Sequence, residues 1–230
     1  MGLVTHGMKR ALVTCVACVI ASCSSSQAGD DFADPELPGR DVNPEGVPYP
    51  TDHLGGHARA GKNAGDRIPN FTFQAYVDGD HAAGLKTISL ADYYDPQSLH
   101  HRVLHLEVAA TWCGVCSAYA DATVKTKEPL GQEGIVYLEV IVAGPRSTSG
   151  PSLADVDGWV KTHNSNFTTA IDVRGTRLSG IGVPPQTMPW DVMIDTRSME
   201  ILDSTAGAPI DLVAYDRSYL ALVAKRPPPY

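Results

Sequence analysis

Thr111-Trp112-Cys113-Gly114-Val115-Cys116 follows directly on the apolar run Val103–Ala110. Two cysteines three residues apart form a disulfide with little strain only where a helix begins at the first, because both then lie on one face about a turn apart. Helix formers fill Ser117 to Glu128, with no Gly or Pro before Pro129, so we expect a helix that ends at Pro129. The pattern predicts that the cysteine pair lies at a strand-to-helix corner.

This corner would make the two thiols chemically different. Cys113 is expected at the helix N-terminus, where unpaired backbone N–H groups and the helix dipole favour a thiolate. Cys116, one turn further on, is expected to be shielded. A thiolate at Cys113 would form a mixed disulfide with a substrate, and Cys116 would then break it.

With Trp112 before the Cys-x-x-Cys pair, the stretch resembles the thioredoxin superfamily, and within it the bacterial membrane-anchored thioredoxin-like reductases and redoxins. Two more places match. Glu107 lies six residues before Cys113, where that family places a buried acid. Thr187-Met188-Pro189 precedes the apolar stretch Trp190–Asp195 and resembles the family's cis-proline loop, which faces the active site. The resemblance covers roughly residues 66 to 225.

The resemblance implies an α/β protein with a thioredoxin-like fold, in which helices flank a central mixed sheet and a strand or hairpin extends the N-terminal side. It implies a thiol-disulfide oxidoreductase that acts on protein thiols and disulfides, with Cys113 as nucleophile, Cys116 as resolving thiol and Glu107 as proton carrier. The redox-active disulfide would be the only redox group, with no cofactor and no metal. The substrate groove would be formed by Trp112, Gly114, Val115, Met188 and Pro189.

Two departures from the family limit what can be carried over. Val115 stands where thioredoxins and most anchored reductases have Pro and protein disulfide isomerases have His, so neither redox potential can be inferred for this chain. The turn between Gly182-Val183 and Pro189 is longer than the family's by about two residues, which predicts a different loop shape. The likeness to anchored reductases favours reduction as the direction of electron flow.

Composition favours one catalytic domain with extensions, because 230 residues with 43% hydrophobic content are enough for one core. The net charge is −8, and beyond residue 22 there are 16 basic and 26 acidic side chains, so nucleic acid is a poor partner. Of the five cysteines, only Cys113 and Cys116 lie beyond the N-terminal segment, which excludes a structural disulfide framework.

The N-terminus has the features of an export signal. Lys9 and Arg10 precede the apolar run Ala11–Ala21, which is too short to span a bilayer comfortably. Ile20-Ala21-Ser22-Cys23 resembles the bacterial lipobox, which implies cleavage before Cys23 and its lipidation; an ordinary signal cut at small residues is the alternative. Ser24 after Cys23 favours the outer membrane by the enterobacterial sorting rule.

We therefore predict three segments: a lipoprotein signal peptide over residues 1–22, a flexible tether over 23–65 and a thioredoxin-like domain over 66–230. The tether is rich in Pro, Gly, Asp and Ser and has few aliphatic residues to offset the entropy of ordering. The protein would be lipid-anchored in the bacterial cell envelope, facing the periplasm, with a membrane electron donor as one possible partner.

Hydrophobic periodicity gives the remaining elements. Strands are expected in the ranges 68–77, 85–94 (with a turn of helix), 103–110, 135–143, 168–173, 190–195 and 199–203. Helices are expected at 153–163, capped by Ser152, and at 211–224. The cysteine pair would then lie within a β-α-β unit with a parallel crossover.

His105 and Glu107 point to the same face of the expected central strand, where an unpaired charge is costly. The functional interpretation is that Glu107, with a raised pKa, takes and returns the proton of Cys116. The structural interpretation is a carboxylate paired with His105 or with a lysine.

Two other functions stay open. The N-terminal extension permits a peroxidase-like redoxin, although no Pro-x-x-x-Thr-type motif precedes Cys113. A metal-binding or copper-chaperone module would need His100, His101 or His105 to complete a site that two thiols leave open. An inactive scaffold with a local disulfide would make Trp112, Glu107 and Pro189 coincidences.

Overall fold

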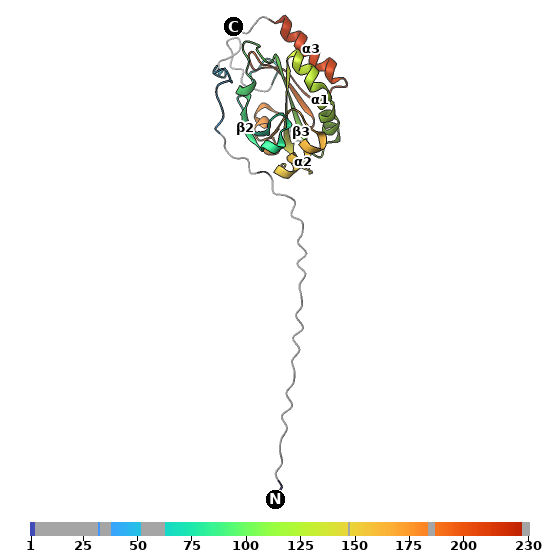
Figure 1. Ribbon diagram of the computed structural model, residues 1–230. Helices are drawn as coiled ribbons and strands as arrows, with labels where there is room; N and C mark the ends of the chain where they lie inside the picture. Colours follow the sequence, from blue (N-terminus) through green and yellow to red (C-terminus); the bar gives the residue numbers. More distant parts are fainter. Residues whose placement is uncertain (3–31, 33–37, 52–62, 147, 184–186, 227–230) are drawn as a thin grey trace.

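The computed structural model describes residues 1–2, 32, 38–51, 63–146, 148–183 and 187–226 (Figure 1). The strands are β1 (Thr72–Tyr76), β2 (Lys86–Ser89), β3 (Val103–Ala110), β4 (Ile135–Ala143), β5 (Thr168–Ile171), β6 (Trp190–Asp195) and β7 (Glu200–Ala206). The α-helices are α1 (Gly114–Glu133), α2 (Leu153–His163) and α3 (Leu212–Lys225). Short 3-10 turns lie between several of these elements. The predicted α/β class is confirmed.

The strands form one mixed sheet in the order β2-β1-β5-β4-β3-β6-β7. β3 pairs in parallel with β4 and antiparallel with β6, and every residue of β3 is buried. β4 pairs in parallel with β5, and the β1–β2 hairpin adds to β5 in the antiparallel sense. The central position of β3 and the N-terminal hairpin agree with the sequence expectation.

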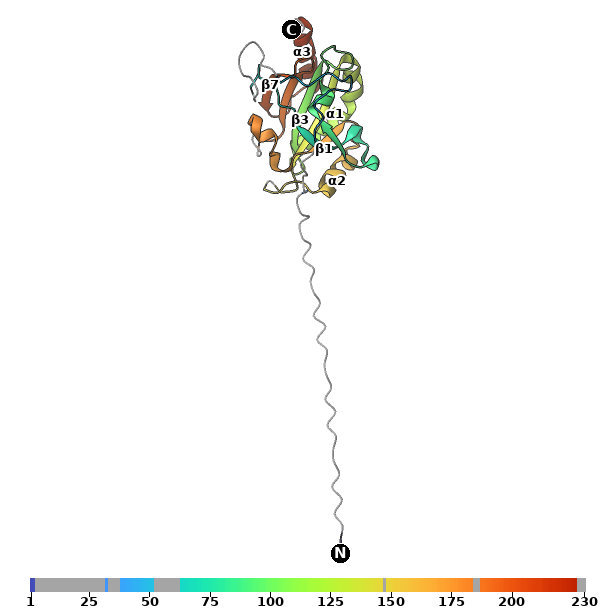
Figure 2. The same ribbon diagram turned by 90° about the vertical axis from the view of Figure 1, so that its left-hand side faces the viewer.

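Alternate side chains of β3 reach two hydrophobic clusters, one on each face of the sheet. Leu104, Leu106 and Val108 belong to the first cluster, which 3-10 turns and the segment around Tyr49 complete. The second cluster contains the cysteine pair and buried residues of α1, α2 and α3. Figures 1 and 2 show α1 and α3 alongside each other. In the described part of the chain no helix is both long and apolar enough to cross a membrane.

The helix that carries the cysteines does not end at Pro129, contrary to the sequence expectation. α1 includes Pro129 and continues to Glu133. Gly134 then takes a left-handed conformation with φ +105°, and its N–H reaches the carbonyls of Leu130 and Gly131. Pro129 removes one helical hydrogen bond, but the fully buried side chain of Leu130 stabilises the turn that follows it. Gly134 then ends the helix, because glycine adopts the left-handed conformation at little cost in free energy.

The expected flexible tether is wrong for residues 38–51. Tyr49 is buried and its hydroxyl donates to the carbonyl of Ile68 at 2.7 Å, while the Asn43 side-chain amide donates to the carbonyl of Tyr94 at 3.0 Å. These contacts offset the ordering cost that composition alone suggested. The predicted signal peptide beyond residue 2, the lipidation site Cys23 and the rest of the tether up to residue 62 lie outside the described residues, apart from residue 32.

Candidate active site

The cysteine pair lies at the strand-to-helix corner that the sequence predicts. Cys113 caps the N-terminus of α1 and forms a disulfide with Cys116, with the two Cα atoms 5.3 Å apart, within the usual range. The backbone N–H of Cys116 donates to the Cys113 sulfur at 3.1 Å. Such a donor favours the anionic form of a sulfur, because it stabilises charge at the helix terminus. Cys113 is 5% exposed and Cys116 is fully buried, so Cys113 is the outer sulfur.

Three of the predicted groove residues, Trp112, Gly114 and Val115, adjoin Cys113 in the chain. Trp112 and Val115 are large apolar side chains that remain 39% and 56% exposed beside Cys113. A side chain at Gly114 would meet open space. Met188 packs against the cluster that contains both cysteines, and the Met188–Pro189 peptide bond is cis. The role of these residues in binding a substrate stays a prediction.

A pocket of about 370 Å³ adjoins Cys113 and is lined in part by Trp112, Trp159 and His163. The ring centroids of His163 and Trp159 are 4.4 Å apart. Nδ1 of His163 lies 2.7 Å from the Asp121 carboxylate. Sequence reasoning did not find this pair. Asp121 is in α1 and His163 ends α2, so the two meet only because the helices pack together, and no spacing along the chain signals it.

Glu107 is buried in β3, directly between Glu139 of β4 and Asp191 of β6 in the register of the sheet. Burial, together with the charges of Glu139 and Asp191, raises the pKa of Glu107 well above its usual value. The raised pKa agrees with the sequence expectation. Neither structural partner suggested for Glu107 is found, because His105 bonds elsewhere and Oε1 of Glu107 has no partner among the described residues.

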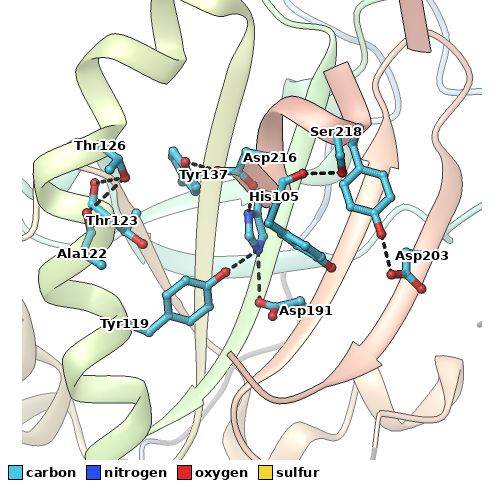
Figure 3. Close-up of polar contacts among 12 residues, drawn as sticks. His105, Tyr119, Ala122, Thr123, Thr126, Tyr137, Asp191, Asp203, Asp216 and Ser218 are labelled. Atoms are coloured by element: carbon cyan, nitrogen blue, oxygen red, sulfur yellow. Dashed lines mark hydrogen bonds and ion pairs between the residues drawn. The ribbon is translucent and has the colours of Figure 1, made fainter. Parts of the chain in front are cut away.

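His105 is the centre of a buried polar network on the same face of β3 (Figure 3). Its Nδ1 lies 2.7 Å from Asp216 of α3, and its Nε2 lies 3.1 Å from Asp191 and 3.0 Å from the Tyr119 hydroxyl. The Tyr137 hydroxyl donates to Asp216. Burial lowers the pKa of His105, but the charge of Asp216 and the bonds to both aspartates outweigh it and raise that pKa to about 9. The imidazole is therefore a cation at neutral pH.

The sequence offered only weak signals for the partners in this network. Asp191 lies in an apolar strand and Asp216 in an apolar stretch of the last helix, and both are fully buried. A buried aspartate implies a partner, but neither position reveals which one. Within the described residues no three His, Cys, Asp or Glu side chains are grouped as metal ligands would be.

No protein-family model and no curated protein sequence matches the chain. A Chlorobium tepidum protein provisionally named thiol:disulfide interchange protein DsbE superposes with a TM-score of 0.54 at 21% identity, over 71% of this chain and 99% of that one. The thioredoxin domain of a Bacteroides vulgatus thiol-disulfide oxidoreductase gives 0.52 at 14% identity, over 68% and 97%. Reduced 2-Cys peroxiredoxin of Plasmodium vivax gives 0.54 at 15% identity, over 70% and 96%. From its sheet order, its disulfide corner and these similarities, the chain has the thioredoxin-like fold.

Proposed function

We propose that this protein is a thiol-disulfide oxidoreductase that exchanges disulfides with protein substrates through Cys113 and Cys116, in the direction of reduction. The observation that carries the proposal is the disulfide at the start of α1, where the N–H of Cys116 donates to the outer sulfur of Cys113. Solved structures with the same fold that are named as thiol-disulfide oxidoreductases support it.

The reduced enzyme begins with a thiolate at Cys113. This thiolate attacks a substrate disulfide, a bond forms between Cys113 and one substrate sulfur, and the other substrate sulfur leaves as a thiolate. Cys116 then gives its proton to Glu107 and attacks the Cys113 sulfur. The second substrate sulfur leaves as a thiolate, and the Cys113–Cys116 disulfide is restored. The substrate has gained two electrons and the enzyme has lost them.

A substrate polypeptide would approach over the exposed apolar surface of Trp112 and Val115. Met188 and Pro189, which precede β6, would complete the groove. The pocket beside Cys113 offers space for a substrate side chain next to the reacting sulfur.

The proposed location is the bacterial cell envelope, with the domain outside the cytoplasm and a lipid anchor at Cys23. The lipobox-like sequence before Cys23 supports this location. Protein thiols and disulfides and a membrane electron donor are the proposed partners.

The test compares two single substitutions with the unaltered protein in an insulin-reduction assay with dithiothreitol. Cys113→Ser should abolish the reduction of insulin, because it removes the nucleophile. Cys116→Ser should leave the first attack intact and accumulate a mixed disulfide, which a mass measurement detects. Full activity of both variants would contradict the proposal.

Peroxide reduction is the second candidate, favoured by the superposition on 2-Cys peroxiredoxin. A peroxidase would consume hydrogen peroxide at a rate that depends on Cys113, with thioredoxin or dithiothreitol as reductant. Peroxide turnover faster than insulin reduction would reverse the order of the two functions. Copper or zinc that is retained through purification and lost with Cys113→Ser would instead favour a metal-binding module.

A further inference from the structure

Three carboxyl groups form a row across the sheet under α1. Glu139, Glu107 and Asp191 occupy matched register positions on β4, β3 and β6, and all three are buried. Residues opposite each other on neighbouring strands have Cβ atoms about 5 Å apart. Two buried carboxylates this close do not both ionise at low cost, so a proton on one can pass to the other.

Asp191 is the member of this row that meets a pocket. The pocket, of about 390 Å³, lies between the end of β7 and the start of α3. Ile210 on its rim is fully exposed whereas Asp191 is fully buried, so Asp191 lies at its inner end. Glu139 is held differently, because one of its oxygens accepts from Trp159 at 3.0 Å and from Thr169 at 3.2 Å.

The two carboxylate oxygens of Asp191 have different surroundings. Oδ1 lies 3.1 Å from Nε2 of His105, whereas Oδ2 is buried and has no partner among the described residues (Figure 3). The unpartnered Oδ2 is thus available to accept a proton. The titratable groups around Asp191 are Glu107 and His105 from β3, Tyr119 from α1, and Tyr215, Asp216 and Tyr219 from α3. Asp211, which caps α3, lines the same pocket.

We propose that Asp191 is a positioning residue that acts through Glu107, passing the proton of Glu107 to and from solvent through the pocket between β7 and α3. The inference rests on the proposed function, in which Glu107 receives the proton of Cys116. A buried acid that takes a proton in each cycle must also release it. Asp191 is its neighbour on the side of this pocket.

The proton balance of the step is simple. Cys116 gives its proton to Glu107 as its sulfur bonds to Cys113, and the substrate sulfur leaves as a thiolate. Before this step can occur, Glu107 must be free of a proton; it passes any proton that it holds to the carboxylate of Asp191, which releases it to water in the pocket.

The experiment follows the reaction of the reduced full chain with Ellman's reagent, with Cys15, Cys18 and Cys23 replaced by Ser. The first phase of thionitrobenzoate release reports attack by Cys113, and the second reports attack by Cys116 on the mixed disulfide. Asp191→Ala should slow the second phase about 10- to 100-fold and leave the first phase unchanged. Added formate, which is small enough to enter the pocket, should restore most of the lost rate.

Asp216→Ala is the matched control, because it removes the other aspartate from the same imidazole without touching Glu107 or the pocket. The control should keep a fast second phase and show no response to formate. If Asp191 acted only through its negative charge, Asp191→Ala would have the opposite effect on the second phase from the effect expected for a relay. Without the negative charge of Asp191 the pKa of Glu107 falls, more Glu107 is ionised, and the second phase would be equally fast or faster.

Each result decides the question. An unchanged second phase in Asp191→Ala, or equal slowing in both variants with no formate response, overturns the relay. If Asp191→Ala does not fold, Asp191→Asn against Asp216→Asn replaces it, and a slow second phase in Asp191→Asn alone supports the relay whereas equal rates overturn it. Absence of the first phase in the unaltered protein would instead refute the proposed function.

Discussion

Glu107 has carboxyl groups on both sides, and this arrangement decides where protons can reside near the disulfide. Glu139 and Asp191 are its neighbours in the sheet, and no basic side chain is placed opposite it in either strand pairing. The positive charge lies two residues away at His105, between Asp191 and Asp216. A cation there stabilises two buried aspartates, while burial and the charges of its two carboxyl neighbours raise the pKa of Glu107.

His105→Gln tests this distribution of charge. The pKa of His105 is raised from 6.5 to about 9 in the folded protein, so the folded state binds more protons than the unfolded state between these values. The stabilisation of the folded state by the protonated His105 is fully present below pH 6.5 and is lost as the pH rises through about 9. The difference in unfolding free energy between the unaltered protein and His105→Gln should shrink by about 3 kcal/mol across this window. Urea unfolding of the oxidised proteins at several pH values measures it.

His100→Gln is the control, because His100 is exposed and lies 3.1 Å from Glu45. The comparison separates the removal of a buried imidazole from the removal of an exposed one. A pH profile of His105→Gln that runs parallel to that of the unaltered protein would show that the imidazole of His105 is not charged in the folded state.

At the level of the elements, one close approach fixes the N-terminal hairpin against the rest of the domain. α1 begins at the cysteine corner and extends past Pro129. The turn after β1 passes so close to the segment before β5 that a Cβ at Gly79 would lie 1.6 Å from the carbonyl oxygen of Ser165. The N-terminal hairpin therefore joins the sheet with its turn fixed against the rest of the domain.

Gly79→Ala should destabilise the protein by about 3 kcal/mol or more, because it adds a backbone clash to an unfavourable φ of +70°. Gly46→Ala separates the two effects. Gly46 has a similar φ, +81°, but no atom lies within 4 Å of the added Cβ. It should cost only about 1 kcal/mol. Denaturant midpoints of both variants test this, and equal losses would show that the segment at Ser165 moves aside freely.

At the scale of the whole molecule, residues 38–51 form part of the folded domain. Tyr49 fills a place in the first hydrophobic cluster, and the Arg40 N–H donates to the Ser89 hydroxyl at 2.9 Å. The first cluster lies on the face of the sheet opposite α1. The folded domain therefore begins well before residue 66, where the sequence pattern predicts its start.

A chain shortened to begin at residue 38 is the reference for a second chain that begins at residue 63. A chain that begins at residue 63 should lose about 3 kcal/mol or more, because a buried tyrosine and several hydrogen bonds are removed. Thermal unfolding of both, with the disulfide intact, measures the difference. Equal stability of the two shortened chains would mean that residues 38–51 lie on the domain without stabilising it.

The sequence by itself determined the features that depend on local spacing. Backbone propensity and apolar periodicity placed the cysteine corner, the strand before it and the helix at Leu153–His163 with its Ser152 cap. The resemblance to the thioredoxin superfamily, and not spacing alone, indicated a buried acid at Glu107, and the acid is buried. The same resemblance indicated the family's cis-proline loop at Met188-Pro189, where the cis bond is found.

Only the tertiary structure decided which side chains face these residues. His105 meets Asp216 across 111 residues of sequence and Asp191 across 86, and Asp121 meets His163 across 42. A periodic pattern fixes the face of a strand or helix to which a side chain points, but not which element lies alongside or in what register. The carboxyl row, the imidazolium and the packing of residues 38–51 all follow from that register and from helix packing, which exist only in the folded chain.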